Sequence, residues 1–136
     1  MTAASDIARQ ACETLAYAYG HHADAGEADK LAELFTTDGV FNRLGTRIVG
    51  REAIRDFIAN RPTHIWQTHR ASNFTFELVG DGRSATGTLD LVLERGQLGD
   101  TRISETVHAR YHDQFVLSEA GWKFKIREVQ IVEPPV

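Results

Sequence analysis

The sequence predicts an α+β fold in which helices pack on one side of a strongly curved, mixed but mainly antiparallel sheet. Helical patterns come first, long alternating segments follow them, and the chain has 136 residues and a mass of 15.2 kDa. That length favours a single domain, residues 1–136. The longest predicted strand, 104–117, would extend roughly 46 Å if it were flat, so the sheet must bend. A bent sheet that faces helices encloses a hollow suited to a small molecule.

The first part of the chain carries three helical patterns. Ser5 is the expected N-cap of a helix whose apolar stripe runs to about residue 24. Gly26 breaks that stripe, and a second, short helix is expected over 27–35. A third helix is expected over 51–60, because its apolar residues fall on one face and a proline follows it.

Alternating apolar and polar residues indicate strands in most of the remaining chain. Gly80-Asp81-Gly82-Arg83 separates two such segments and is a strong hairpin signal. The composition of 36–39 indicates a turn before the first strand. Strands are therefore expected over 40–43, 46–49, 70–79, 85–94, 104–117 and 122–132. The residues most suited to the core or to a pocket wall are Phe35, Phe41, Ile54, Phe57, Phe74 and Phe115.

Charge and composition argue against several classes of function. Lys and Arg number 15 against 19 Asp and Glu, a net charge of −4 without any basic run, so no nucleic-acid partner is expected. No stretch approaches the roughly 18 uncharged apolar residues of a membrane helix, so no membrane partner is expected. The N-terminal sequence lacks the pattern of a secretory signal, and the lone Cys12 cannot form an internal disulfide. Both observations favour a cytoplasmic protein.

Several short motifs are shared with one known family. They are Tyr19-Gly-His-His-Ala-Asp24, Leu31-Ala-Glu-Leu-Phe35-Thr-Thr-Asp38-Gly39, Gly50-Arg-Glu-Ala-Ile54, the Gly80–Ala85 hairpin and Gly121-Trp-Lys-Phe-Lys-Ile-Arg127. With them the chain resembles SnoaL-like domains of the NTF2-like superfamily over nearly its whole length. The likeness is greatest to the branch of scytalone dehydratase, bile-acid dehydratase and hexachlorocyclohexane dehydrochlorinase. The resemblance implies a cone-shaped α+β barrel of the cystatin-like type that takes a small-molecule substrate and self-associates as a homodimer or homotrimer.

Asp24 and His69 are the strongest candidates for chemistry. Elimination beside a carbonyl needs a base for a weakly acidic C–H proton and an acid for the leaving group. Histidine suits both tasks because its ordinary pKa lies near neutrality, and a carboxylate improves it by fixing its tautomer. Asp24 falls where the first helix ends and His69 where the first long strand begins, and the resemblance implies that they form a catalytic dyad. On the residues alone, a helix-ending aspartate and a surface-loop histidine are the plainer interpretation.

Five further residues are expected to contact the substrate. The Tyr19 hydroxyl is suited to bind a developing oxyanion, as the resemblance implies, although a core tyrosine fits the pattern equally well. Arg127 shares the alternation of its neighbouring lysines, which places it on a solvated basic edge or in the pocket, where it would keep its charge. Asp90 interrupts an apolar strand and either faces the pocket or accepts an internal hydrogen bond. Trp66 and Asn73 complete the set, with a structural role preferred for both.

Two histidine patterns suggest metal sites but do not fit their predicted elements. His108 and His112 are spaced like ligands on a helix, yet in a strand they stand roughly 13 Å apart, too far to share one ion. His22-Ala23-Asp24 has the spacing of a non-haem iron motif on a strand, but these residues end a helix. No metal and no cofactor are therefore expected.

The sequence thus predicts a cofactor-independent lyase that performs a dehydratase-like elimination on a small, largely apolar cyclic substrate. An isomerase of the ketosteroid type or a polyketide cyclase is the first alternative, because the same proton abstraction serves those reactions. A non-catalytic ligand-binding protein, or a protein like the β-subunit of a ring-hydroxylating dioxygenase, is the second alternative.

Overall fold

The computed structural model describes residues 2–132 of the chain. They form three helices, α1 Ala3–Asp24, α2 Ala28–Ala32 and α3 Arg51–Ala59. The strands are β1 Phe35–Arg43, β2 Thr46–Val49, β3 Ile65–Val79, β4 Ser84–Gln97, β5 Glu105–Ser118 and β6 Gly121–Ile131. No helix in this part of the chain is both long and apolar enough to cross a bilayer.

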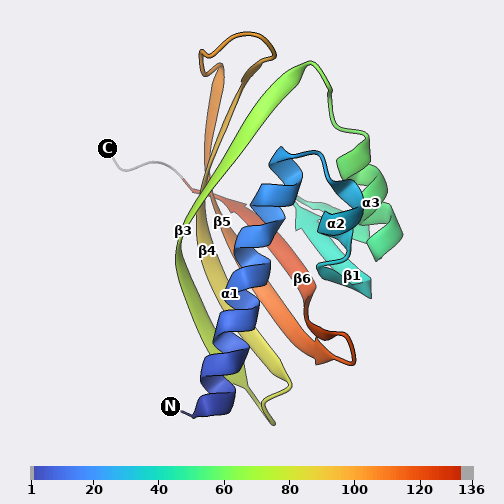
Figure 1. Cartoon of the computed structure of the whole chain (residues 1–136), viewed down its shortest axis with the longest axis vertical. Helices are drawn as coiled ribbons and strands as arrows, with labels where there is room; N and C mark the ends of the chain where they lie inside the picture. Colours follow the sequence, from blue (N-terminus) through green and yellow to red (C-terminus); the bar gives the residue numbers. More distant parts are fainter. Residues whose placement is uncertain (1, 133–136) are drawn as a thin grey trace.

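The strands form one mixed sheet in the order β2-β1-β6-β5-β4-β3. All neighbouring pairs are antiparallel except β1 and β6, which run parallel. Figure 1 shows the sheet bending behind α1, which crosses the face called here the inner face, while α2 and α3 lie toward the end that carries β1. The predicted α+β architecture, with helices on one side of a curved sheet, is confirmed.

Alternation along the long strands decides which side chains form the core. In β4, Leu89, Leu91 and Leu93 are buried on the inner face, and Tyr111 of β5 is buried beside Leu89. Burying a side chain of this size contributes roughly 1.5–3 kcal/mol, so this one face holds the sheet to the helices. The predicted core residues are confirmed: Phe35, Phe41, Ile54, Phe74 and Phe115 are buried, and Phe57 is partly buried against them.

The start of α1 differs from the prediction because another residue caps it. Thr2, rather than Ser5, is the N-cap, and its hydroxyl accepts a hydrogen bond of 3.0 Å from the backbone N–H of Ser5. A threonine oxygen, like a serine oxygen, accepts a hydrogen bond from one of the free N–H groups of the first turn. The helix therefore gains a turn at its start and ends at Asp24, where the apolar stripe ends.

Three strands, β1, β3 and β4, are longer than the alternation suggests. β1 begins at Phe35, and the residues predicted as a turn at 36–39 are taken up by a register shift against β6 before Val40. β3 begins at Ile65 rather than at residue 70, because it pairs with β4 as far as Gln97. Hydrogen bonding between strands, which the sequence does not display, sets these boundaries.

A β-bulge in β6 changes the face of the sheet on which Arg127 lies. Lys125 is the residue skipped where the register of β6 against β5 shifts. Phe124 before the bulge and Arg127 after it are both buried on the inner face. Arg127 therefore does not share the alternation of Lys123 and Lys125, and that expectation is wrong because the extra residue changes which face the following residues occupy.

Candidate active site

Asp24 and His69 are in direct contact, although 45 positions separate them in the chain. Oδ1 of Asp24 lies 2.5 Å from Nδ1 of His69, and Oδ2 accepts a hydrogen bond of 2.8 Å from the His69 backbone N–H. One carboxylate thus holds both the ring and the main chain of the same residue, which fixes the ring orientation and places the proton of a neutral imidazole on Nδ1. The His69 side chain is 4% exposed and that of Asp24 is 25% exposed.

The pair forms because the end of α1 lies against β3. Asp24 is the last residue of α1. The sequence predicts His69 at the start of the first long strand, whereas in the structure it lies four residues inside β3. The two elements approach so closely that a Cβ at Gly20 would lie 2.8 Å from the Cβ of His69. Glycine weakens a helix by up to about 1 kcal/mol relative to alanine. Here the missing side chain is what lets the helix and the strand meet.

His69 lines an inner chamber of about 220 Å³. Its Nδ1 is turned to Asp24, which does not line the chamber, so Nε2 is the ring nitrogen that remains for the chamber. An apolar cavity of roughly 150 Å³ holds benzene, so the chamber has room for one small ring with a few substituents. Most of its wall is apolar or aromatic, from Tyr19, Phe41, Leu44, Leu91, Leu93, Val107, Ala109, Tyr111, Val129 and Ile131.

Tyr19 reaches the chamber from α1. Its ring centre lies 6.2 Å from that of His69 and 5.6 Å from that of Tyr111. Its hydroxyl is buried and has no hydrogen-bond partner among residues 2–132. Burial raises the pKa of Tyr19, against the opposing effect of nearby arginine charges. The hydroxyl therefore stays protonated and has a hydrogen bond to donate.

Arg127 does not line the chamber but lies behind its tyrosines. The guanidinium carbon is 3.6 Å from the centre of the Tyr111 ring and 4.7 Å from that of Tyr19. Nε lies 3.1 Å from a carboxylate oxygen of Asp113, and both side chains are fully buried. This cation is enclosed by its ion pair and by aromatic faces, so Arg127 does not share the chamber wall with Tyr19 and His69. Its guanidinium packs against the rings of both tyrosines.

Asp113 is expected to make the protein less stable as the pH rises. Burial raises the pKa of this carboxyl from 3.8 to about 6, against the opposing effect of the Arg127 charge. Because the folded-state pKa exceeds that of the unfolded chain, stabilisation from this group is complete below the unfolded-state pKa and is lost as the pH rises through the folded-state value. Urea unfolding across that window should show a steeper decline in the wild type than in Asp113→Asn. Equal slopes would contradict the assignment.

Asp90 and Asn73 lie on the outer face of the sheet, away from the chamber. Asp90 accepts hydrogen bonds of 3.0 Å from Asn73 and 2.7 Å from Arg110, and these two donors lower its pKa. Asn73 occupies a bulge of β3 with a φ of +57°, a conformation that asparagine tolerates better than most residues. Internal hydrogen bonds therefore hold both side chains, which is one of the two roles expected for Asp90 and the structural role preferred for Asn73.

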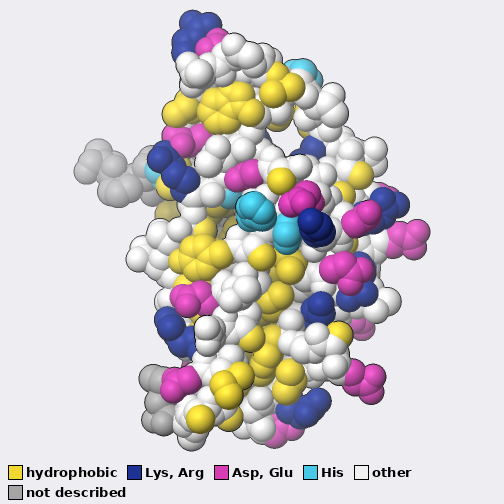
Figure 2. All heavy atoms as spheres, viewed as in Figure 1, with side chains coloured by type: hydrophobic (Ala, Val, Ile, Leu, Met, Phe, Trp, Pro, Cys, Tyr) yellow, Lys and Arg dark blue, Asp and Glu magenta, His cyan; other side chains and the backbone are white. Residues whose placement is uncertain are grey.

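Trp66 lines a surface cavity beside the chamber instead of the chamber itself. Figure 2 shows a hollow there, below the segment that joins α3 to β3. The indole N–H donates a hydrogen bond of 2.8 Å to the backbone carbonyl of Asp100. That bond ties β3 to the loop after β4, which is the structural role that the sequence favours for Trp66.

Five polar residues of the chamber are not singled out by any sequence motif: Arg43, Arg61, Arg95, Glu105 and Tyr111. Arg43 follows the buried Phe41 by two positions in β1, so strand alternation carries a signal that it faces inward. Tyr111 is likewise part of an alternating strand. Arg61 follows α3 in an irregular segment, and no periodicity indicates where its side chain lies.

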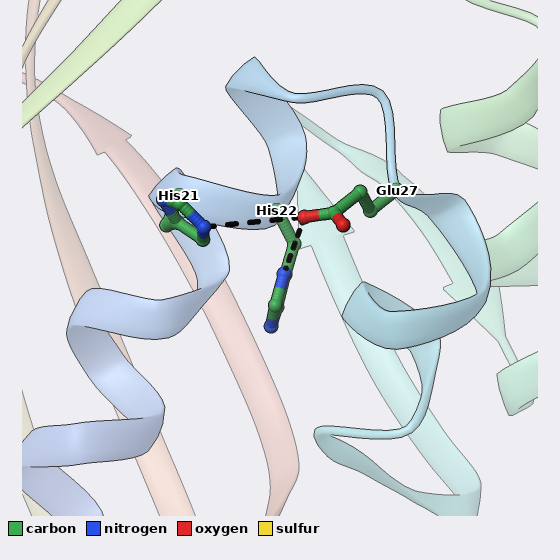
Figure 3. A group of neighbouring side chains, drawn as sticks. All are labelled: His21, His22 and Glu27. Atoms are coloured by element: carbon green, nitrogen blue, oxygen red, sulfur yellow. Dashed lines mark hydrogen bonds and ion pairs between the residues drawn. The ribbon is translucent and has the colours of Figure 1, made fainter.

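Residues of metal-binding type gather at the surface where α1 turns into α2. Glu27 pairs with Nδ1 of His22 at 3.1 Å, and a ring nitrogen of His21 lies 4.0 Å from the same oxygen (Figure 3). Lys30 donates to the other oxygen of Glu27 at 3.0 Å, and the contacts with His22 and Lys30 lower the pKa of Glu27. His22 thus pairs with Glu27 and not with Asp24, and the cluster fastens the turn between the two helices.

The chain is similar to known proteins in both sequence and structure. The SnoaL-like domain family matches residues 7–128, and no curated protein matches the chain. A crystal structure of a proposed scytalone dehydratase from Novosphingobium aromaticivorans shares 22% identity over 98% of this chain and 89% of its own, with a TM-score of 0.85. LinA shares 20% identity over 95% and 91% of the two chains, with a TM-score of 0.82. A proposed aromatic ring hydroxylase from N. aromaticivorans shares 27% identity over 93% and 90%, with a TM-score of 0.80.

Proposed function

The chain belongs to the SnoaL-like domain family, and from this premise we propose that it is a cofactor-independent lyase acting on a small, largely apolar cyclic carbonyl compound. The observation that carries the proposal is the Asp24–His69 pair at the wall of a small, mostly apolar chamber. An imidazole backed by a carboxylate and shielded from water is suited to take and return a proton. The likeness to a proposed scytalone dehydratase and to LinA supports the reaction class through the shared fold.

The proposed reaction moves one proton and one leaving group. Nε2 of His69 takes the proton from the carbon beside the carbonyl, and the electron pair of that C–H bond forms an enolate. The pair then forms the C=C bond as the bond from the next carbon to its hydroxyl or halide breaks. A departing hydroxide takes the proton from His69 and leaves as water. A halide leaves as the anion, and the proton passes to solvent.

Three other groups have supporting roles in this proposal. Asp24 stabilises the imidazolium form of His69 and fixes the ring. The Tyr19 hydroxyl, which lacks a partner in the described chain, donates a hydrogen bond to the enolate oxygen. Arg127 acts through Tyr19 as a positioning residue, because its guanidinium packs against the tyrosine ring.

Turnover of a defined set of compounds tests the proposal. The set consists of small cyclic β-hydroxyketones, including 3-hydroxycyclohexanone, incubated with the protein in D₂O. We expect a product lighter by one water, the conjugated enone, with deuterium exchange beside the carbonyl, and neither process with His69→Ala. A protein that exchanges no proton and eliminates no water from any member of the set would contradict the proposal.

An isomerase or a cyclase is the alternative that keeps the same base. In an isomerase the proton taken by His69 returns to another carbon. Its product has the mass of the substrate apart from deuterium at the new position, whereas elimination removes a water or a hydrogen halide. Mass spectrometry of the same D₂O reactions therefore separates the two.

A non-catalytic binder or an oxygenase subunit is the second alternative, and the likeness to a proposed aromatic ring hydroxylase favours it. Such a protein would catalyse neither exchange nor elimination. As an oxygenase subunit it would co-purify with a larger iron–sulfur protein. This chain is purified from its own cells, and the iron and sulfide that co-purify with it are measured. Their presence in a larger bound protein would favour the oxygenase subunit over the lyase.

Gly20→Ala is expected to lower turnover far more than stability. The added methyl group would lie 2.8 Å from the Cβ of His69, closer than two carbon atoms tolerate, so α1 or β3 must shift. The better helix propensity of alanine, about 1 kcal/mol, offsets part of the strain. A displaced base slows the reaction steeply, so we expect kcat to fall roughly tenfold with a small change in Tm. An unchanged kcat would show that His69 tolerates the shift.

A further inference from the structure

The inner chamber adjoins a wider outer cavity across a boundary that carries excess positive charge. The outer cavity, about 740 Å³, shares four lining residues with the chamber, and the boundary formed by these residues is called here the passage: Arg43, Arg61, Arg95 and Glu105. Arg95 is bound to Glu105 at 2.6 Å. Arg43 and Arg61 form no ion pair with any other residue of 2–132. The passage therefore holds two arginines without a carboxylate to balance them.

Arg61 is the more constrained of the two. Its Nη1 is buried and has no hydrogen-bond partner in the described chain. The guanidinium carbons of Arg43 and Arg61 each lie 5.7 Å from the centre of the Phe57 ring, so one aromatic side chain has two cations beside it. A buried donor without a partner costs about 1–3 kcal/mol, and more when it is charged. An anion in the passage would remove that cost.

The charge of Arg61 also reaches the chamber. Among the arginines that oppose the raised pKa of Tyr19, Arg61 has the largest effect, ahead of Arg127 and Arg43. Arg61 lines the chamber together with Tyr19 and His69. An anionic group held by Arg61 would therefore lie at the edge of the space where the proposed chemistry takes place.

We propose that Arg61, assisted by Arg43, binds a carboxylate of the substrate in the passage, and that the substrate is a small ring carrying this carboxylate. The inference rests on the proposed function, because the ring must then occupy the chamber beside His69. A guanidinium suits this role, since its planar set of donors matches the two oxygens of a carboxylate and it keeps its charge when desolvated. The chamber of about 220 Å³ accommodates the ring, and the excess positive charge of the passage attracts the anion.

Benzoate and benzamide are the probes, because they have nearly the same shape and differ in charge at neutral pH. Isothermal titration of the whole chain is expected to show roughly tenfold tighter binding of benzoate, the range of a charge-assisted hydrogen bond. Arg61→Gln is expected to abolish this preference. Arg55→Gln is the matched control, because Arg55 is an α3 residue paired with Asp29 and Asp56 at 3.5 and 3.3 Å, and it should leave the preference unchanged.

Equal binding of the two probes by the wild type, binding of neither, or a preference that survives in Arg61→Gln would each overturn the inference. If Arg61→Gln does not fold, as judged by circular dichroism, Arg61→Lys and Arg43→Gln take its place, and each should reduce the preference. The binding measurement requires no turnover. Elimination without a preference for benzoate would count against this inference alone, whereas the preference without elimination in any compound would count against the lyase.

Discussion

His69→Ala is expected to lower kcat/KM for elimination by roughly 10²–10⁴-fold, the usual contribution of a general base, while the protein stays folded. The side chain accounts for little of the core, because it borders a cavity on one side and Asp24 on the other. The hydrogen bond from the backbone N–H of residue 69 to Asp24 does not involve the imidazole, so the contact between α1 and β3 survives. Steady-state kinetics with the hydroxyketone set, together with circular dichroism, measures both parts of the expectation.

Asp24→Asn provides the sharper form of the same test. The asparagine has nearly the same size, but its amide can present an N–H to Nδ1 of His69, and the imidazole then carries its proton on Nε2, where the base is needed. Turnover should therefore fall with little change in Tm. Asp29→Asn, at an exposed aspartate of α2, is the control and should alter neither quantity. Normal turnover in His69→Ala or in Asp24→Asn would end the proposed mechanism.

Asp113→Ala is expected to lower the free energy of unfolding by about 3–5 kcal/mol, because it leaves a buried cation without its counter-charge. Arg127 is 0% exposed, and Asp113 is its ion-pair partner at 3.1 Å. The remaining contacts of the guanidinium are mainly aromatic faces, which stabilise a cation less than a carboxylate does. Urea unfolding at neutral pH measures the loss, and Glu119→Ala, at an exposed turn, is the control for removal of an acidic group.

The double variant Asp113→Leu/Arg127→Met separates loss of packing from the cost of an unpaired charge. Replacing both members of a buried ion pair with apolar residues is often close to neutral, since no charge is then left unpaired. We therefore expect the double variant to be more stable than Asp113→Ala. A double variant that is less stable than the single one would show that the ion pair itself, rather than its balance of charge, holds the core together.

The helices and long strands could be predicted from periodicity because buried faces repeat at regular intervals. The buried Leu89, Leu91 and Leu93 alternate with partly exposed residues, and their side chains lie on the inner face as that period of two requires. A β-bulge interrupts this alternation of inward- and outward-facing residues. The skipped residue Lys125 is visible only in the pairing of β6 with β5, so the sequence pattern could not decide whether Arg127 lies on a solvated edge or on the inner face.

The candidate site divides in a similar way. The contact between Asp24 and His69 spans 45 positions, and no periodicity connects residues so far apart, so its prediction depended on resemblance to a family. The same resemblance says nothing of Arg61, which lies in an irregular segment and belongs to none of the shared motifs. For Asp90 the sequence left two roles open, because a polar residue within an apolar strand indicates a special environment without telling on which face that environment lies.

The parallel pairing of β1 with β6 has a consequence for how the protein is made. Phe41 of β1 lies opposite Arg127 of β6. During synthesis β1 therefore cannot pair with β6 until most of the chain has been made. Until then β1 and β2 form a two-stranded hairpin, which is marginally stable on its own and has an unprotected edge. Asp113 likewise lacks its cation during that interval. The nascent chain thus depends on β6 both to cover the edge of β1 and to complete the core, so aggregation through that edge is most expected in the interval before β6 has been made.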